Sequence, residues 1–306
     1  MKAVFNILFI LVFLLPASDA FALQTKGTIS VGQQLRSYRI VLPTGQAPAG
    51  GYPLVLAFHG GGMQGAGMER ISLMDRQAER YHFIVIYPDG IDKHWNDGRS
   101  TIRNPQDDVG FVSALLAQAE QRYPVNKTRI FATGISNGAL FAERLGCELS
   151  SQISAIAPVA GTIPDALISH CHPAKPIAVL QIDGTADPIM PFNGGAVNDF
   201  HGLGEGGRVS SVAETDSFWA KNNHCSSVVR SEHLPPIARL DSTRVDRLVY
   251  ENCPAKGLVE QLTIIGGGHV WPGGNQPFHP FITGRPSRQI NASAAIAAFF
   301  MALPAR

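Results

Sequence analysis

Short apolar runs alternate along the chain with stretches in which apolar residues recur every three or four positions. The runs predict strands covered on both faces, and the stretches predict amphipathic helices. This alternation favours a mostly parallel central sheet with helices on both faces, so we expect an α/β fold. The predicted strands are 36–42, 53–59, 83–87, 129–134, 153–159, 177–182 and 259–265. The predicted helices are 68–81, 109–122, 137–147, 211–222 and 292–303.

The N-terminal segment has the pattern of a secretory signal peptide. Lys2 gives a positively charged start, residues 7–15 are all apolar, and residues 20–22 form an A-x-A cleavage site. The apolar run is too short to span a bilayer as a helix. We therefore expect residues 1–22 to be removed. Residues 23–306 should then form a single domain that is secreted or periplasmic, without a stable membrane anchor.

The composition narrows the class of protein. The chain has 306 residues, of which 45% are hydrophobic and 16% charged, so it can bury a large core and is not a disordered protein. A formal net charge of +1 offers no basic field for a nucleic-acid partner. The glycine-rich stretch 193–207 predicts a mobile loop within the domain rather than a linker between domains.

Export changes how the four cysteines are interpreted. In an oxidising compartment Cys147, Cys171, Cys225 and Cys253 can form two disulfides, for which three pairings exist. Proximity along the chain favours Cys147–Cys171 and Cys225–Cys253. The alternative is four buried free thiols, which an oxidising compartment disfavours.

The strongest chemical signal is the G-x-S-x-G segment 134–138. It follows a predicted strand and opens a predicted helix, which is the context of a nucleophile elbow. Such a turn holds its serine in a strained backbone conformation, and the flanking glycines let neighbouring backbone approach. Ser136 is therefore the candidate nucleophile, and the alternative is an ordinary glycine-rich turn.

A second glycine-rich turn, the H-G-G-G segment 59–62, ends the predicted strand 53–59. Its bare backbone N–H groups suit the stabilisation of an oxyanion, which needs two fixed donors near the developing charge. We expect one donor to be the N–H of Gly61. The other should be the N–H of Asn137, the residue after the candidate nucleophile.

A serine hydroxyl needs a base, and the base needs a carboxylate that orients it. After a nucleophile elbow, the acid and then the histidine follow along the chain. Asp183 and Asp187 both follow the predicted strand 177–182. Asp187 is favoured because it lies farther out on the loop, whereas Asp183 can satisfy N–H groups in the turn. His269, on the glycine-rich loop after the last predicted strand, is the candidate base.

Seven segments together resemble the secreted esterases grouped as the polyhydroxybutyrate depolymerase and feruloyl esterase family, within the α/β-hydrolase fold. They occur in order from about residue 36 to the end of the chain, and together they are far more specific than G-x-S-x-G alone. The chain departs from the family pattern at Gly61, where cysteine is common, and at Asp183, where histidine is common. The matching segments are 58–62, 87–90 with Trp95 and Asn96, 107–111, 134–138, 157–161, 184–188 and 268–274.

The resemblance implies a carboxylic ester hydrolase that works through an acyl-enzyme. Ser136 would be the nucleophile, Asp187 the acid and His269 the base, with the N–H groups of Gly61 and Asn137 binding the oxyanion. No metal or organic cofactor is implied. The H-x-H pair at 170–172 is only a weak metal signal, because no third ligand lies at a useful spacing.

The substrate pocket is predicted from aromatic residues near the catalytic loops. Trp95, Phe192 and Trp271 are expected to line an acyl or aromatic pocket, with ordinary core packing as the alternative. No surface-binding module follows the last predicted helix. The expected substrates are therefore soluble hydroxyalkanoate oligomers, or feruloyl or acetyl esters of polysaccharides. The alternative hypotheses are a serine peptidase and a non-catalytic carbohydrate-binding protein on the same fold.

Overall fold

The computed structural model describes residues 23–199, 204–254, 256–276 and 278–305. The predicted signal peptide lies outside the described residues. The strands of the main sheet are β1 (Leu23–Val31), β2 (Gln34–Leu42), β3 (Tyr52–Phe58), β4 (Ile84–Pro88), β5 (Val125–Ile135), β6 (Ala155–Val159), β7 (Ala178–Gly184), β10 (Val229–His233), β11 (Arg244–Tyr250) and β12 (Val259–Ile265). The short strands β8 (Gly195–Ala196) and β9 (Arg208–Val209) pair with each other apart from this sheet.

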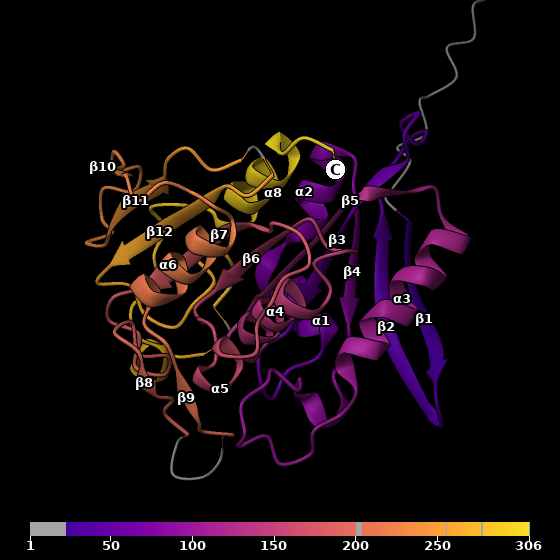
Figure 1. The fold of residues 1–306 in the computed structure, drawn as a ribbon, viewed down its shortest axis with the longest axis horizontal. Helices are drawn as coiled ribbons and strands as arrows, with labels where there is room; N and C mark the ends of the chain where they lie inside the picture. The colour runs from indigo at the N-terminus through magenta and orange to yellow at the C-terminus, as the bar shows by residue number, and fades with distance from the viewer. Residues whose placement is uncertain (1–22, 200–203, 255, 277, 306) are drawn as a thin grey trace, which may run out of the picture.

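The main sheet runs across the whole molecule in the order β1-β2-β4-β3-β5-β6-β7-β12-β11-β10 (Figure 1). Its inner strands, from β4 through β12 in this order, pair in parallel. The strands at each edge pair antiparallel with their neighbours. The sheet is therefore mostly parallel in its centre, as the alternation of strands and helices predicts.

Helices cover both faces of this sheet. They are α1 (Gly65–Ser72), α2 (Met74–Tyr81), α3 (Asp108–Arg122), α4 (Asn137–Glu148), α5 (Asp165–Ile168), α6 (Val212–Asn222), α7 (Pro280–Thr283) and α8 (Ala292–Ala302), with a 3-10 turn at Ile91–Lys93. Side chains of α3, α4 and α6 pack into one hydrophobic cluster, and those of α1, α2 and α8 into another.

Strand β3 shows why two clusters form. Its seven residues are all buried, and they alternate between the two clusters: Leu54 and Leu56 belong to one, and Val55 and Ala57 to the other. Successive side chains of a strand point to opposite faces of the sheet, so a fully apolar strand needs a covering layer on each side.

Several features of the fold differ from the sequence-based prediction. The predicted helix 68–81 is two helices, because Leu73 takes a left-handed conformation with φ 52° and ends α1. The strands β1, β10 and β11 were not predicted. β1 and β10 are the two edge strands and β11 lies next to β10, and all three carry many exposed or half-exposed residues, so they lack the continuous apolar run of an inner strand.

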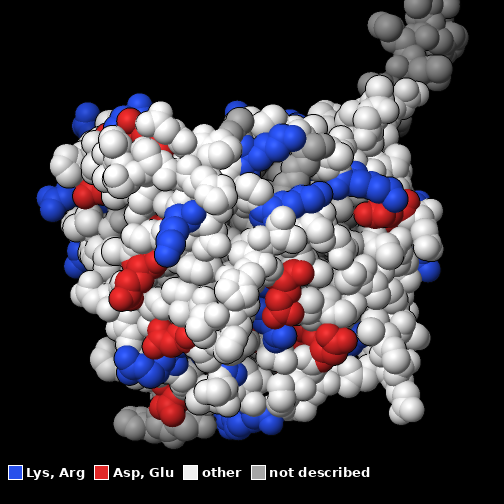
Figure 2. All heavy atoms as spheres, in the orientation of Figure 1, with Lys and Arg blue, Asp and Glu red and all other residues white. Residues whose placement is uncertain are grey.

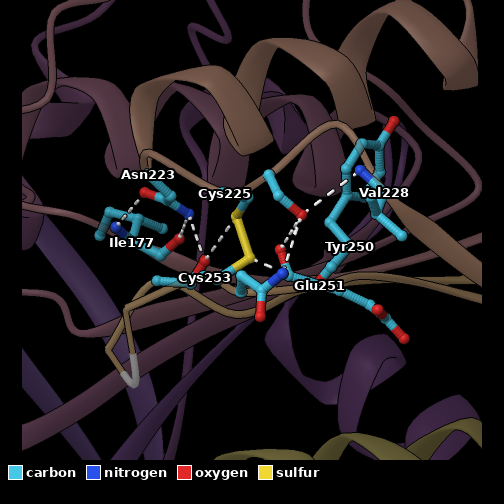
Figure 3. The surroundings of a disulfide bond; sticks show 10 residues. Ile177, Asn223, Cys225, Val228, Tyr250, Glu251 and Cys253 are labelled. Atoms are coloured by element: carbon cyan, nitrogen blue, oxygen red, sulfur yellow. Dashed lines mark hydrogen bonds between the residues drawn. A yellow bond between two sulfur atoms is a disulfide. The ribbon is translucent and has the colours of Figure 1, made fainter.

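Both favoured disulfides are confirmed. Cys147 at the end of α4 is bonded to Cys171, and Cys225 after α6 is bonded to Cys253 after β11 (Figure 3). Among the described residues no cysteine is free. Beside the second disulfide, the Asn223 side chain donates to the carbonyls of Ile177 and Gly257 and accepts from the N–H of Ile177. This end of α6 is thus tied to two other segments by side-chain bonds.

The surface carries charges of both signs. On the face drawn in Figure 2, Lys and Arg side chains lie scattered among Asp and Glu and a larger uncharged surface. None of the helices in the described part of the chain has the length and apolar character needed to cross a bilayer.

Candidate active site

Ser136 lies on a sharp turn between β5 and α4. Its backbone has φ 58° and ψ −126°, a conformation that L-residues rarely adopt, and its N–H donates to Val159 O over 3.0 Å. A Cβ on Gly134 would lie 2.4 Å from Gly138 O, and one on Gly138 would lie 2.5 Å from Phe58 O and His59 O. The two glycines are therefore needed for the chain to turn this tightly, as the G-x-S-x-G pattern predicts.

His269 is held by Asp187 on the adjacent loop. The distance between His269 Nδ1 and Asp187 Oδ2 is 2.8 Å, and both side chains are almost fully buried. The other carboxylate oxygen, Oδ1, accepts from the N–H groups of Ile189 and Met190 over 2.7 and 2.8 Å. A carboxylate only accepts, so Nδ1 of His269 carries the hydrogen and Nε2 of the neutral ring keeps its lone pair.

The other candidate acid, Asp183, lies deeper in the sheet. Its Oδ1 accepts from Gly161 N over 3.1 Å, and burial raises its pKa from 3.8 to about 7. Of the two aspartates, the structure brings Asp187 to His269.

Ser136 and His269 line the same cavity. Among the described residues no hydrogen bond joins the Ser136 hydroxyl to the His269 ring. In serine hydrolases this contact is often long in the absence of substrate and tightens in the complex. The cavity therefore brings together the candidate nucleophile and the candidate base.

The two candidate oxyanion donors also lie on this cavity. Gly61 and Asn137 both line it, and within the described ranges neither of their N–H groups has an acceptor. Asn137 is the first residue of α4, where N–H groups point out of the helix unpaired and the helix dipole favours negative charge. These are the properties that an oxyanion site requires.

The loop that carries Gly61 is fixed by a buried histidine. His59 Nε2 accepts from Gly90 N over 2.9 Å, and Nδ1 lies 2.9 Å from Gly60 O. This pattern requires a neutral ring with the hydrogen on Nδ1. Burial lowers the pKa of His59 to about 4, so the ring stays neutral under ordinary conditions.

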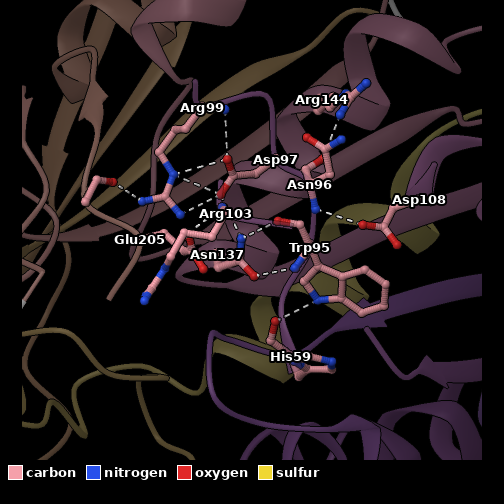
Figure 4. A network of polar contacts seen from close by, with 11 residues as sticks. His59, Trp95, Asn96, Asp97, Arg99, Arg103, Asp108, Asn137, Arg144 and Glu205 are labelled. Atoms are coloured by element: carbon pink, nitrogen blue, oxygen red, sulfur yellow. Dashed lines mark hydrogen bonds and ion pairs between the residues drawn. The ribbon is translucent and has the colours of Figure 1, made fainter. Parts of the chain in front are cut away.

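Trp95 contributes to the site from behind the cavity wall. Its indole N–H donates to His59 O over 3.0 Å (Figure 4). Its ring packs against Phe58 and Phe141. It is fully buried and is not among the residues that line the cavity. The expectation that Trp95 lines a substrate pocket is therefore not retained.

The cavity has a volume of about 330 Å³ and is mainly apolar. Of the other two aromatic residues expected there, Trp271 lines it, with its indole N–H bonded to Ser293 Oγ, whereas half-buried Phe192 does not. The wall also carries the polar residues His94, Arg99 and Glu205, which sequence reasoning missed. The apolar residues of the wall include Met63, Ile71, Ile135, Ile189, Met190, Val197, Val270, Phe278 and Ile282.

A patch of exposed apolar side chains continues from the cavity. Phe278 and Ile282 line the cavity and are 50% and 44% exposed, and Phe281 beside them on α7 is 93% exposed. Within the described ranges, no group of three or more His, Cys, Asp or Glu side chains is arranged to hold a metal ion.

Comparison with known proteins identifies the family. The chain matches no protein-family model. It is 31% identical over 296 residues to the protein named "Putative esterase NocK" from Nocardia uniformis subsp. tsuyamanensis, which covers 94% of this chain and 84% of that protein. The chain belongs to this family of esterases. Together with the relatives and the fold described next, this confirms the resemblance to the polyhydroxybutyrate depolymerase and feruloyl esterase family and makes the protein a carboxylic ester hydrolase.

Two further relatives agree with this assignment, and one solved structure shares the fold. Feruloyl esterase B of Piromyces equi is 29% identical over 195 residues, which are 61% of this chain and 34% of that protein. Feruloyl esterase C of Emericella nidulans is 29% identical over 167 residues, or 52% and 58% of the two chains. The match thus spans only part of these two relatives. An acetyl xylan esterase from Aspergillus awamori shares the fold, with a TM-score of 0.58 and 14% identity over 84% of this chain and 96% of that one.

Proposed function

We propose that the ester hydrolase acts through Ser136, His269 and Asp187 as nucleophile, base and orienting acid. The observation that carries this proposal is the 2.8 Å contact between His269 Nδ1 and Asp187 Oδ2, on a cavity that also contains the strained Ser136. A binding protein has no need of an oriented imidazole on the same cavity as a strained serine. This argues against the carbohydrate-binding alternative.

The proposed reaction proceeds in two steps. His269 Nε2 takes the proton of Ser136 as Oγ attacks the ester carbonyl, and the N–H groups of Gly61 and Asn137 bind the oxyanion. The bond to the alcohol oxygen breaks, and His269 returns its proton to that oxygen to release the alcohol. Water then loses a proton to His269 and attacks the carbonyl of the acyl-enzyme. The bond between the acyl carbon and Ser136 Oγ breaks, and His269 passes its proton to Oγ, which frees the acid and restores Ser136.

The substrate class follows from the cavity and from the relatives. We propose esters with a small acyl or aromatic acyl group, such as feruloyl or acetyl esters of polysaccharides or hydroxyalkanoate oligomers. The mainly apolar cavity of about 330 Å³ suits such an acyl group, and the polar side chains of His94, Arg99 and Glu205 suit a hydroxylated remainder. The names of the two feruloyl esterase relatives support the aromatic choice.

We also propose that the protein is exported. The support is the pattern of residues 1–22 together with the two disulfides, which form and persist in oxidising compartments.

A panel of esters tests the proposed activity. Residues 23–306, produced with the disulfides oxidised, would be assayed on p-nitrophenyl acetate and butyrate, methyl ferulate and hydroxybutyrate oligomers, beside a Ser136→Ala variant. We expect hydrolysis that is lost by about three to six orders of magnitude in the variant. A peptide anilide in the same panel tests the peptidase alternative. Full activity in the Ser136→Ala variant would overturn the proposal.

A further inference from the structure

The side chain of Asn137 is locked in place, although the proposed reaction uses only its backbone N–H. Its Oδ1 accepts from Trp95 N over 2.8 Å, and its Nδ2 donates to Trp95 O and Asp97 Oδ2 over 2.9 and 2.7 Å (Figure 4). Asn137 is 3% exposed. Among the described residues, the hydrogen bonds that hold this side chain therefore all come from one segment, Trp95 to Asp97, on the loop after β4.

Asp97 is in turn held by Arg99. Its carboxylate accepts from Arg99 Nε over 3.0 and 3.1 Å, from Nη2 over 2.7 Å and from the backbone N–H over 3.0 Å. The side chains of Asp97 and Arg99 are 0% and 4% exposed. A buried carboxylate with this many charged and neutral donors has one well-defined orientation.

Arg99 also reaches the wall of the cavity. Its Nη1 donates to Gly206 O, and the residue lines the cavity beside Glu205. Glu205 Oε2 accepts from Arg103 N over 2.9 Å. The same ion pair thus contacts the start of α4 on one side and the segment Gly204–Gly207 on the other.

The start of α4 needs such an anchor. The N–H of Asn137 has no acceptor among the described residues, and the strained backbone of Ser136 precedes it directly. An oxyanion donor is effective only when it is aimed before the charge develops. The hydrogen bonds of the Asn137 side chain therefore hold this residue in position, which its unpaired N–H cannot do.

We propose that Asp97, oriented by Arg99, is a positioning residue that fixes Asn137 and thereby aims its N–H at the oxyanion. This inference rests on the proposed serine esterase function. It assigns to the segment Trp95–Arg99 a role in the chemical step, through Asn137, although the Asp97 carboxylate itself does not touch the substrate.

A double-mutant cycle tests this role. The variants are Asp97→Ala, Asn137→Ala and the two combined, assayed on p-nitrophenyl acetate. Asn137→Ala keeps the N–H but removes the side chain that Asp97 holds. We expect each single variant to lower kcat about 10- to 100-fold with KM changed less than about threefold, and the double variant to be no slower than the slower single variant.

The affinity for a boronic acid is a second measurement, and it would not change if the role of Asp97 were purely structural. The boronic acid forms a tetrahedral adduct with the serine, so its affinity should fall in the Asp97 variant by about the same factor as kcat/KM. Should Asp97→Ala fail to fold, Asp97→Asn replaces it in the cycle. Its amide oxygen can still accept from Asn137, but the charged hydrogen bonds to Arg99 are lost. We therefore expect a smaller loss of kcat than in Asp97→Ala. In the Asn137→Ala background the Asp97→Asn change should cause no further loss.

The matched control is Glu260→Gln. Glu260 on β12 holds Arg247 by two hydrogen bonds of 2.6 and 2.9 Å and does not line the cavity, so this variant loses an ion pair without touching α4. We expect lower stability and unchanged kcat. The inference is overturned if the losses from Asp97 and Asn137 multiply, or if kcat in the Asp97 variant stays within twofold of the parent. If Ser136→Ala retains activity, it is instead the proposed function that fails.

Discussion

At the scale of single residues, two aspartates only four positions apart have opposite surroundings. Asp187 is surrounded by donors: two backbone N–H groups and the His269 ring. Asp183 has one backbone donor to Oδ1, and its buried Oδ2 has no hydrogen-bond partner among the described residues. In the sequence, its position farther out on the loop after the predicted strand 177–182 already favours Asp187 as the acid. The contact itself depends on His269, 82 positions away, and so could not be predicted from local pattern.

The two aspartates should respond differently to the same isosteric change. Asp187→Asn should lower kcat about 10³- to 10⁴-fold, because the amide would favour the wrong tautomer of His269. Asp183→Asn should lower it less than about tenfold, since Asp183 makes no contact with the base. Steady-state kinetics on one chromogenic ester would compare them. A larger loss from Asp183→Asn would reverse the assignment.

Asp183 should also make stability depend on pH. Burial, with a smaller effect of the Asp187 charge, raises its pKa from 3.8 to about 7. Its contribution to the free energy of unfolding is therefore fully present below pH 3.8 and is lost as the pH rises through about 7. Burial also raises the pKa values of its neighbours Glu143 and Asp216, which act in the same direction.

Asp183→Asn removes this dependence at one position. The variant should gain on the order of 5 °C in Tm relative to the parent as the pH is raised from about 4 to about 8. Calorimetry of both proteins across that range measures the difference. A difference in Tm that does not change with pH would contradict the assigned titration.

At the scale of elements, the sequence pattern predicted the strands that are buried on both faces of the sheet and most of the long helices that cover them. The inner strands and most long helices appear where their apolar patterns place them. The edge strand β10 has five exposed residues, so its position follows from backbone pairing with β11 rather than from any side-chain pattern. The break between α1 and α2 at Leu73 could not be predicted either, because neither a proline nor a glycine marks it.

Helix α4 should be intolerant of a single methyl group at its start. Gly138→Ala would place a Cβ 2.5 Å from two carbonyl oxygens at the end of β3, so α4 must move away from the sheet and carry Ser136 with it. We expect a loss of at least about 100-fold in kcat/KM, or failure to fold. Ala142→Gly on the same helix is the control, with about 1 kcal/mol lower stability and normal kcat. Normal activity of Gly138→Ala would show that the turn is looser than described.

At the scale of the whole molecule, the sheet gathers the site from distant parts of the chain. Ser136, Asp187 and His269 follow β5, β7 and β12, which lie within four adjacent parallel strands whose carboxyl ends share one edge. This arrangement is what made the proposed triad predictable. Most of the cavity wall and the bonds from Trp95 to Arg99 belong to irregular loops, whose paths no periodic pattern reveals. That is why Trp95 was expected in the pocket.

The disulfides should stabilise the molecule without serving the reaction. The Cys225–Cys253 bond closes a loop of 28 positions, and none of the four cysteines lines the cavity. The double variant Cys225→Ser/Cys253→Ser should lose about 3.5 kcal/mol in free energy of unfolding, or roughly 5 to 10 °C in Tm. Its kcat at room temperature should match the parent. Thermal denaturation with and without reductant measures this, and an unchanged Tm would contradict it.

The apolar patch of Phe278, Phe281 and Ile282 has a consequence for how such an enzyme can change over time. Phe281 and Ile282 lie on the short helix α7 and Phe278 lies just before it, and in the part of the chain that the structure describes none of the three bonds to Ser136, Asp187 or His269. A lineage, or a designer, can therefore exchange side chains on this segment and alter which esters are preferred while the chemistry is inherited intact.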